Sequence, residues 1–127
     1  MKELTKAEEQ VMKILWKLER GFVHDIIEKM PNPKPAYNTV STIVRILVKK
    51  KFVGYEAFGK THQYHPLVDK DQYSKFFLSN FIGGYFGGSF QNMVSFFAKE
   101  NDMDVNELDE LLSKVKQNLK DQSDDID

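Results

Sequence analysis

The sequence predicts a mainly α-helical protein with one small β-hairpin. Apolar residues recur at helical spacing in several segments, and one Gly-Lys pair separates two short runs rich in aromatic and β-branched residues. The chain has 127 residues, 41% of them hydrophobic, so it can bury a core without disulfides or metals. It contains no cysteine, which excludes a disulfide framework and thiolate chemistry.

The first predicted helix covers residues 5–19. Thr5 and Glu8 form a capping-box pair, in which each side chain accepts a hydrogen bond from the backbone at the start of the helix. Trp16 is expected to be part of the core, because large aromatic side chains usually close small cores. Apolar residues repeat at helical spacing at Leu4, Ala7, Val11, Ile14, Leu15 and Leu18.

A short second helix is predicted over residues 23–30 and a third over residues 37–50. The prolines at positions 31, 33 and 35 interrupt regular structure between them. The third helix has an apolar stripe of Val40, Ile43, Val44, Leu47 and Val48. Its other face carries small polar groups and cations, at Asn38, Ser41, Thr42, Arg45 and Lys49. Such a face suits a DNA major groove, because small side chains let the helix approach the base edges.

Residues 52–58 and 61–66 are predicted to form a β-hairpin. Their connection, Gly59-Lys60, is typical of a type II′ turn. Three helices followed by a hairpin is the element order of a winged helix-turn-helix domain. Several α+β folds share this order, but here the cations gather on the third helix and the hairpin tip.

Charge is divided unevenly along the chain. Residues 1–75 hold 14 Lys and Arg against 9 Asp and Glu, whereas residues 76–127 hold 4 against 10. The basic cluster suits a polyanion such as DNA, while a net charge of −1 argues against indiscriminate coating of nucleic acid. A solvated basic face is the alternative reading. In residues 34–60 only Glu56 opposes Lys34, Arg45, Lys49, Lys50, Lys51 and Lys60.

Residues 76–98 contain no charge, and 9 of the 16 aromatic residues lie between Tyr73 and Phe97. A transmembrane helix is the alternative reading, but ten of these 23 residues are Gly, Ser, Asn or Gln. We therefore expect two helices, roughly 69–82 and 89–101, broken at Gly83-Gly84 and Gly87-Gly88. Two short helices cannot bury so many Phe side chains, so a partner subunit is expected to cover them.

A last helix is predicted over residues 104–120, with Asp104 and Glu107 in capping positions. The domains expected are thus a DNA-binding domain, residues 1–68, a helical dimerisation domain, residues 69–120, and a disordered acidic tail, residues 121–127. The apolar stripe of the last helix is Val105, Leu108, Leu111, Leu112, Val115 and Leu119.

The sequence offers little support for an enzyme, a metal site or a cofactor site. His62 and His65 are three residues apart on a predicted strand, which sends their side chains to opposite faces. His24, beside Asp25, is expected to be an exposed surface residue. The run from Gly83 to Gly88 follows no strand and has no lysine partner, so it does not suit a phosphate cradle.

Four segments carry a resemblance to a known family. They are LTKAEEQVMKILW, YNTVSTIVRILVKKKF, GKTHQYHPLV and FIGGYFGGSFQNMVSFFAKE. Their order and spacing resemble the BlaI/MecI/CopY family of penicillinase-type repressors, from Leu4 to about Leu119. The resemblance implies a dimeric winged-helix repressor that binds a dyad-symmetric operator. Several members are inactivated by proteolysis triggered through a membrane-bound sensor peptidase.

By position, the resemblance places Asn38, Thr39, Ser41 and Thr42 at the start of the recognition helix, and Lys60 at the wing tip. The full expected DNA-binding set is Lys34, Tyr37, Asn38, Thr39, Ser41, Thr42, Arg45, Lys49, Lys50, Lys60 and His62. The expected dimerisation set is Tyr73, Phe76, Phe77, Phe81, Tyr85, Phe86, Phe90, Phe97, Leu108, Leu111, Leu112 and Val115.

Three departures from the family pattern stand out. The family often has Arg where this chain has Ile46, with Arg45 preceding it. Inducible members are cut at an Asn-Phe bond, and the candidate cleavage position here is Phe96-Phe97. The cysteine-rich tail of the copper-responsive branch is absent.

The sequence thus predicts a cytoplasmic homodimeric transcriptional repressor. Its expected partners are double-stranded operator DNA, a second copy of the chain and a membrane sensor peptidase, without insertion into the membrane itself. Two alternatives remain at this point. One is a winged-helix protein-interaction module without DNA binding, and the other is a membrane-associated regulator that uses residues 76–98.

Overall fold

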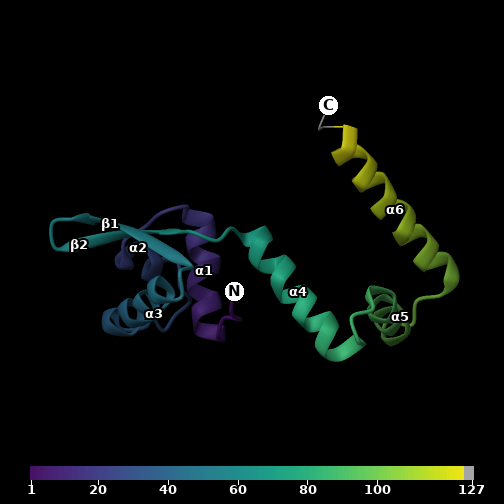
Figure 1. Cartoon of the computed structure of the whole chain (residues 1–127), viewed down its shortest axis with the longest axis horizontal. Coiled ribbons are helices and arrows are strands. Elements are labelled where there is room, and N and C mark those ends of the chain that lie inside the picture. Colours follow the sequence, from purple (N-terminus) through teal and green to yellow (C-terminus); the bar gives the residue numbers. More distant parts are fainter. Residues whose placement is uncertain (125–127) are drawn as a thin grey trace. The chain divides into compact units, whose positions relative to one another are not determined.

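The computed structural model describes residues 1–124, and side chains as far as residue 122. The chain divides into two compact units, residues 1–78 and the residues from 79 onward, and each is described by itself. The first unit contains three complete helices, a two-stranded antiparallel hairpin and the start of a fourth helix (Figure 1). The complete elements are α1 (Lys6–Leu18), α2 (Val23–Glu28), α3 (Tyr37–Lys49), β1 (Val53–Phe58) and β2 (Thr61–Pro66). The predicted helices and hairpin are therefore confirmed, with ends that shift by one or two residues.

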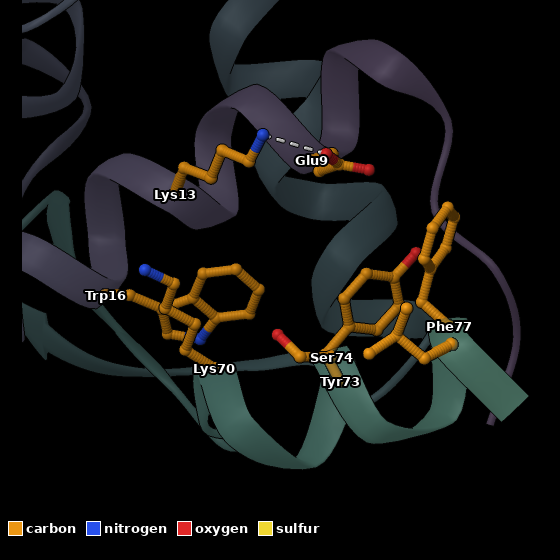
Figure 2. Close-up of a pocket in the computed structure, with 8 residues that line it drawn as sticks. Glu9, Lys13, Trp16, Lys70, Tyr73, Ser74 and Phe77 are labelled. Atoms are coloured by element: carbon orange, nitrogen blue, oxygen red, sulfur yellow. Dashed lines mark ion pairs between the residues drawn. The ribbon is translucent and has the colours of Figure 1, made fainter. Parts of the chain in front are cut away.

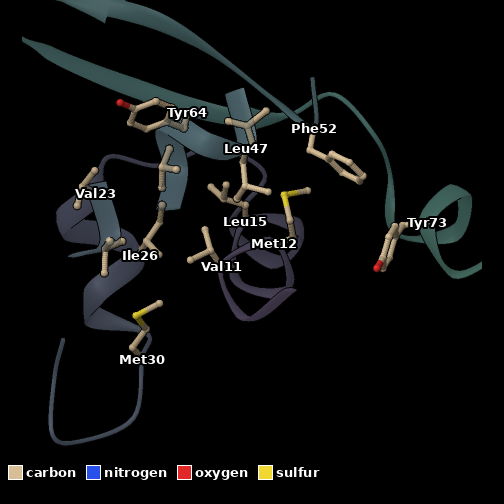
Figure 3. Packing of buried hydrophobic residues seen from close by; sticks show 13 residues of the cluster. Val11, Met12, Leu15, Val23, Ile26, Met30, Leu47, Phe52, Tyr64 and Tyr73 are labelled. Carbon is tan, nitrogen blue, oxygen red and sulfur yellow. The ribbon is translucent and has the colours of Figure 1, made fainter. Parts of the chain in front are cut away.

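The hydrophobic core of the first unit lies between the three helices and the hairpin (Figure 3). Residues from α1, α2, α3 and β1 are fully buried because their apolar stripes face one another. The residues without exposed surface are Val11, Met12, Leu15, Ile26, Val40, Val44 and Leu47, with Phe52 and Val53 at 1%.

The hairpin has the predicted two-residue turn. Its register runs from Val53 opposite Pro66 to Phe58 opposite Thr61, and Gly59 adopts a φ of 64°. Glycine takes this left-handed conformation at no steric cost, which is what the turn requires. Gly21 extends the sheet by an isolated bridge, in which it exchanges backbone hydrogen bonds of 2.9 and 2.8 Å with Tyr64.

The N-terminus of α1 is held by the predicted capping box and by an ion pair. The Glu8 amide donates to the Thr5 hydroxyl at 3.2 Å, and the Thr5 amide donates to the Glu8 carboxylate at 2.9 Å. Lys50, which follows α3, donates to both Glu8 carboxylate oxygens at 2.8 and 2.7 Å. Burial by itself raises the pKa of Glu8, but the hydrogen bonds from Lys50 and Thr5 outweigh it and hold that pKa below its ordinary value.

Helix α4 (Lys70–Phe86) begins within the first unit, which ends at Leu78, whereas the domain boundary expected from the sequence follows residue 68. Tyr73 is 4% exposed, and its hydroxyl accepts a hydrogen bond from the Leu4 amide at 2.9 Å. The Trp16 indole donates to the Val68 carbonyl at 2.9 Å, which confirms Trp16 as part of the packed interior. Figure 2 shows the start of α4 against α1, with Trp16 and Tyr73 lining a hollow of about 290 Å³.

The predicted helix break at Gly83-Gly84 is wrong, because α4 continues to Phe86. Glycine weakens a helix by only about 1 kcal/mol and does not forbid it. The break lies at Gly87-Gly88, where φ values of 59° and 81° end the helix. Ser89 then caps α5 (Phe90–Glu100) by accepting a hydrogen bond from the Asn92 amide at 3.1 Å.

Helix α6 (Val105–Asp124) continues four residues past the end expected at residue 120. No glycine or proline interrupts it, and Gln117 donates to the Asp121 carboxylate at 3.0 Å one turn later. Residues 121–124 of the segment expected to be a disordered tail thus belong to α6, and residues 125–127 lie outside the described residues. No helix in the described part of the chain is both long enough and apolar enough to span a membrane.

The Glu8–Lys50 pair generates the first testable prediction. We expect Glu8→Gln to lower the free energy of unfolding by about 1–3 kcal/mol, because it leaves the Lys50 ammonium without its charged partner. Urea unfolding near neutral pH measures this difference. The control is Glu9→Gln, which breaks a more exposed pair with Lys13 in the same helix and should cost roughly 0.5 kcal/mol or less.

The same pair predicts a pH dependence. Because the pKa of Glu8 is lower in the folded than in the unfolded state, its stabilisation is complete above the ordinary value of 4.5 and is lost as the pH falls through the folded-state value. The wild type should therefore lose more stability than Glu8→Gln on acidification. Equal losses in the two proteins would contradict this assignment.

Candidate nucleic-acid interface

One face of α3 is free of the core. Tyr37 is 45% exposed, and Asn38, Thr39, Thr42 and Arg45 are also exposed. The Thr42 hydroxyl donates to the Asn38 carbonyl at 2.8 Å, one turn earlier in the helix. The helix thus presents short polar side chains near its start and cations toward its end, as predicted.

A hollow of about 410 Å³ separates this face of α3 from the hairpin. We call it the α3–hairpin hollow. Three of its lining residues, Arg45, Lys49 and Lys60, are cations, and no lining residue is a carboxylate. Unopposed cations in a concave surface attract a polyanion and raise its local concentration. Its lining residues are Tyr37, Asn38, Ser41, Arg45, Val48, Lys49, Tyr55, Lys60, Thr61, His62 and Tyr64.

The hairpin side of the α3–hairpin hollow is aromatic. The rings of Tyr55 and His62 stack with centroids 4.4 Å apart and planes 9° apart. Tyr64 is 6% exposed, and burial raises its pKa despite the opposing effect of the Arg45 charge. Its hydroxyl therefore stays protonated at neutral pH.

Sequence reasoning missed Tyr55, Thr61 and Tyr64 as parts of this surface. The register of the hairpin, which can be read from the sequence, would have placed Tyr55 and Tyr64 on the same face as His62. With the turn fixed at Gly59-Lys60, Tyr55 lies opposite Tyr64. Period-two alternation places His62 on the face of that pair, and this is the face that meets α3.

Three residues of the predicted DNA-binding set are placed differently from the expectation. Ser41 is 8% exposed and lines the wall of the hollow, so it is less accessible than the residues that project from the helix. The Lys50 ammonium is paired with Glu8. The Lys34 ammonium donates to the carbonyl oxygens of Glu28 and Met30 at 2.9 and 2.5 Å, at the end of α2.

The position at which the family often has Arg is Ile46, which is 39% exposed and does not line the hollow. Arg45 does line it. His62 and His65 line different hollows, and His65 shares its own with Glu19, Arg20, Glu56 and Gln63. His24 is exposed, as predicted, and its ring lies beside that of Tyr37, with centroids 5.0 Å apart and planes tilted by 44°.

The predicted dimerisation residues divide between the two units. Tyr73 is buried in the first unit, so it is unavailable for a partner, and Phe76 packs against the same core. Phe77 is 37% exposed. The members in the second unit are Phe81, Tyr85, Phe86, Phe90, Phe97, Leu108, Leu111, Leu112 and Val115.

The second unit has no interior of its own. None of the side chains of residues 79–122 is buried. Phe86 contacts Phe81 and Phe96 at centroid distances of 5.8 and 5.6 Å, but Tyr85 and Phe90 are 76% and 64% exposed. Exposed apolar surface of this kind is typical of sites that contact another protein, a membrane or a ligand.

Comparison with known proteins identifies the family. The penicillinase repressor family profile matches residues 4–117. The methicillin resistance regulatory protein MecI of Staphylococcus aureus (strain N315) is 30% identical over 110 residues, which cover 86% of this chain and 89% of MecI. The penicillinase repressor of Bacillus licheniformis is 24% identical over 122 residues, covering 93% of this chain and 95% of the relative.

One similar solved structure is the DNA-binding domain of the repressor BlaI, in solution. It is 26% identical, covers 57% of this chain and 94% of its own, and superposes with a TM-score of 0.49. The family profile spans most of the chain, and the resemblance of its four segments is confirmed. The chain therefore belongs to the penicillinase repressor family, a family of transcriptional repressors.

Proposed function

We propose that this chain is a homodimeric repressor whose two subunits bind the two halves of a dyad-symmetric DNA operator. The observation that carries the proposal is the α3–hairpin hollow, with three cations and no carboxylate. Nucleic-acid phosphates supply the negative charge that such a surface attracts. The family membership agrees with this reading.

In this proposal α3 enters the major groove. Asn38, Thr39 and Thr42 lie at its exposed start, where short polar side chains can reach base edges. Arg45 and Lys49 follow one and two turns later, and Lys60 stands at the tip of the hairpin. The cations position the protein on the backbone, whereas the polar residues select the sequence.

The second unit supplies the dimer contact. A second copy is the occupant that suits its apolar surface, because a dyad-symmetric operator requires two identical DNA-binding units. Linking the two units makes binding of the second half-site effectively intramolecular, which raises the overall affinity without any new DNA contact.

Salt dependence tests DNA binding against a pure protein-interaction module. If each dimer makes roughly six to ten phosphate contacts, the affinity should fall by about 10³ to 10⁵ between 50 and 200 mM salt. A flat response would exclude the proposal. Lys60→Ala should reduce the salt slope by about one contact per subunit, whereas Lys116→Ala, which removes an exposed cation of α6, should leave it unchanged.

Affinity measurements with different DNA sequences separate residues that position the protein on the DNA backbone from residues that select the sequence. Asn38→Ala should change which sequences bind, by about 1–3 kcal/mol for each lost base contact, while Lys60→Ala should weaken all sequences nearly equally. Identical behaviour of the two variants would contradict the roles given to α3 and the hairpin.

Truncation tests the dimer contact. A fragment ending at Leu78 keeps Tyr73 and its hydrogen bond to Leu4, so we expect it to fold. It should sediment as a monomer and bind a two-half-site duplex more weakly than the full chain. A dimeric fragment would place the interface in the first unit and contradict this part of the proposal.

We also infer that cleavage between Phe96 and Phe97 relieves repression, because it would divide α5 within the dimerisation unit. The two side chains are 49% and 47% exposed, but the bond lies inside a helix and must open locally before a peptidase can bind it. Incubation of the DNA-bound protein with a sensor peptidase of a relative should release fragments that end at Phe96. Release of the intact chain by a small molecule would contradict this mechanism.

A further inference from the structure

His62 is held at the wall of the α3–hairpin hollow. It is the second residue of β2, it is partly exposed, and its ring stacks on Tyr55 at 4.4 Å. Tyr64 makes a second ring contact from the same strand, with centroids 6.1 Å apart and planes 66° apart. These contacts fix the imidazole on the surface that faces α3 without engaging it in an ion pair.

The charged groups that share the hollow with His62 are all cations. Arg45 and Lys49 come from α3, and Lys60 comes from the hairpin turn. The other titratable lining residues are the phenols Tyr37, Tyr55 and Tyr64. The hairpin carboxylate, that of Glu56, lines the separate hollow that contains His65. No carboxylate that lines the α3–hairpin hollow is therefore present to pair with an imidazolium.

A DNA phosphate would be the first anion to enter this hollow. An opposite charge nearby favours the charged form of a titratable group, and imidazole is the side chain that ordinarily changes charge between about pH 5 and pH 8. We propose that DNA binding by this chain is coupled to protonation of His62, so that the affinity for DNA rises as the pH falls from about 8 to about 6. This inference rests on the proposed function and adds a regulatory property to the same site.

The direction of the pH dependence follows from the thermodynamic linkage between proton binding and DNA binding. A proton that binds more strongly to the DNA-bound protein than to the free protein is taken up on binding. Lower pH supplies that proton and therefore favours the complex. Each subunit of the proposed dimer contributes one His62, so up to two protons are taken up for each DNA duplex bound.

The chain is well suited to a test, because it has three histidines and no cysteine, and therefore few side chains of the types that change charge near neutral pH. His65 lies in a different hollow, together with Glu19, Arg20 and Glu56. His24 is exposed and lies beside Tyr37, the first residue of α3, with the two ring planes tilted by 44°. Each of these two histidines therefore provides a matched control for His62.

The experiment measures DNA affinity against pH for the full-length protein, at constant ionic strength because phosphate contacts depend on salt. The probe is a duplex selected by the same protein from a random-sequence pool. We expect the wild-type affinity to rise about three- to tenfold per subunit between about pH 8 and pH 6. His62→Gln should abolish the rise, whereas His65→Gln and His24→Gln should retain it.

A second variant and a second measurement guard against a merely structural effect. His62→Phe keeps an aromatic ring for the stack on Tyr55 but cannot bind a proton, so it should bind DNA with a pH-independent affinity. Calorimetry in buffers of different ionisation enthalpy counts the protons taken up on binding. The wild type should take up protons near pH 7, and both His62 variants should take up fewer.

The outcomes separate this inference from the proposed function. Salt-dependent DNA binding with an affinity that is the same at pH 6 and pH 8 would overturn the proton coupling and leave the repressor proposal intact. A rise that survives in both His62 variants, or that His65→Gln or His24→Gln removes, would also overturn it. Absence of DNA binding at every pH would instead remove the proposed function and this inference with it.

Discussion

The rotation of α3 about its own axis is the constraint on which the α3–hairpin hollow depends. Val40, Val44 and Leu47 have no exposed surface, and they lock one side of the helix into the core. With 3.6 residues per turn, a helix that is fixed on one side is fixed on the other. Turning α3 to bury Arg45 instead would place an unpaired charge in the core, which costs several kcal/mol. Core packing thereby also aims the polar residues outward.

Some of the cations near α3 hold the fold together and are not free to bind a polyanion. Lys50 ties the end of α3 to Glu8 at the start of α1. The next residue, Lys51, adopts a φ of 66°, and the Lys51 and Phe52 amides donate to the Val48 and Leu47 carbonyls at 3.0 Å. This helix end turns the chain toward β1. A count of cations in residues 34–60 therefore overestimates the unpaired positive charge near α3, and the three cations of the hollow give the better measure.

Sequence periodicity predicts the helices and the hairpin well, because each depends on contacts within a few residues. It fails where a contact between residues far apart in the sequence determines whether a side chain is buried. Tyr73 belongs by composition to the aromatic segment, but its partner is the amide of Leu4, 69 positions away. Ser41 belongs by pattern to the polar face of α3, but it is buried where α3 packs within the first unit, which the helix pattern alone does not show. The helix through Gly83-Gly84 shows the same limit, since local propensity is a weak preference that surroundings can override.

The two units differ in how they can be stable. The first has a closed core from Val11 to Tyr73, whereas in the second no described side chain is buried. Ordering a helix costs conformational entropy, and without buried apolar surface little offsets that cost. The second unit therefore gains most of its stability from whatever covers its aromatic side chains, and a second copy ties its folding to protein concentration. In the proposed dimer, loss of the second copy would leave the first unit folded and its α3–hairpin hollow intact, but would remove the linked second DNA-binding unit.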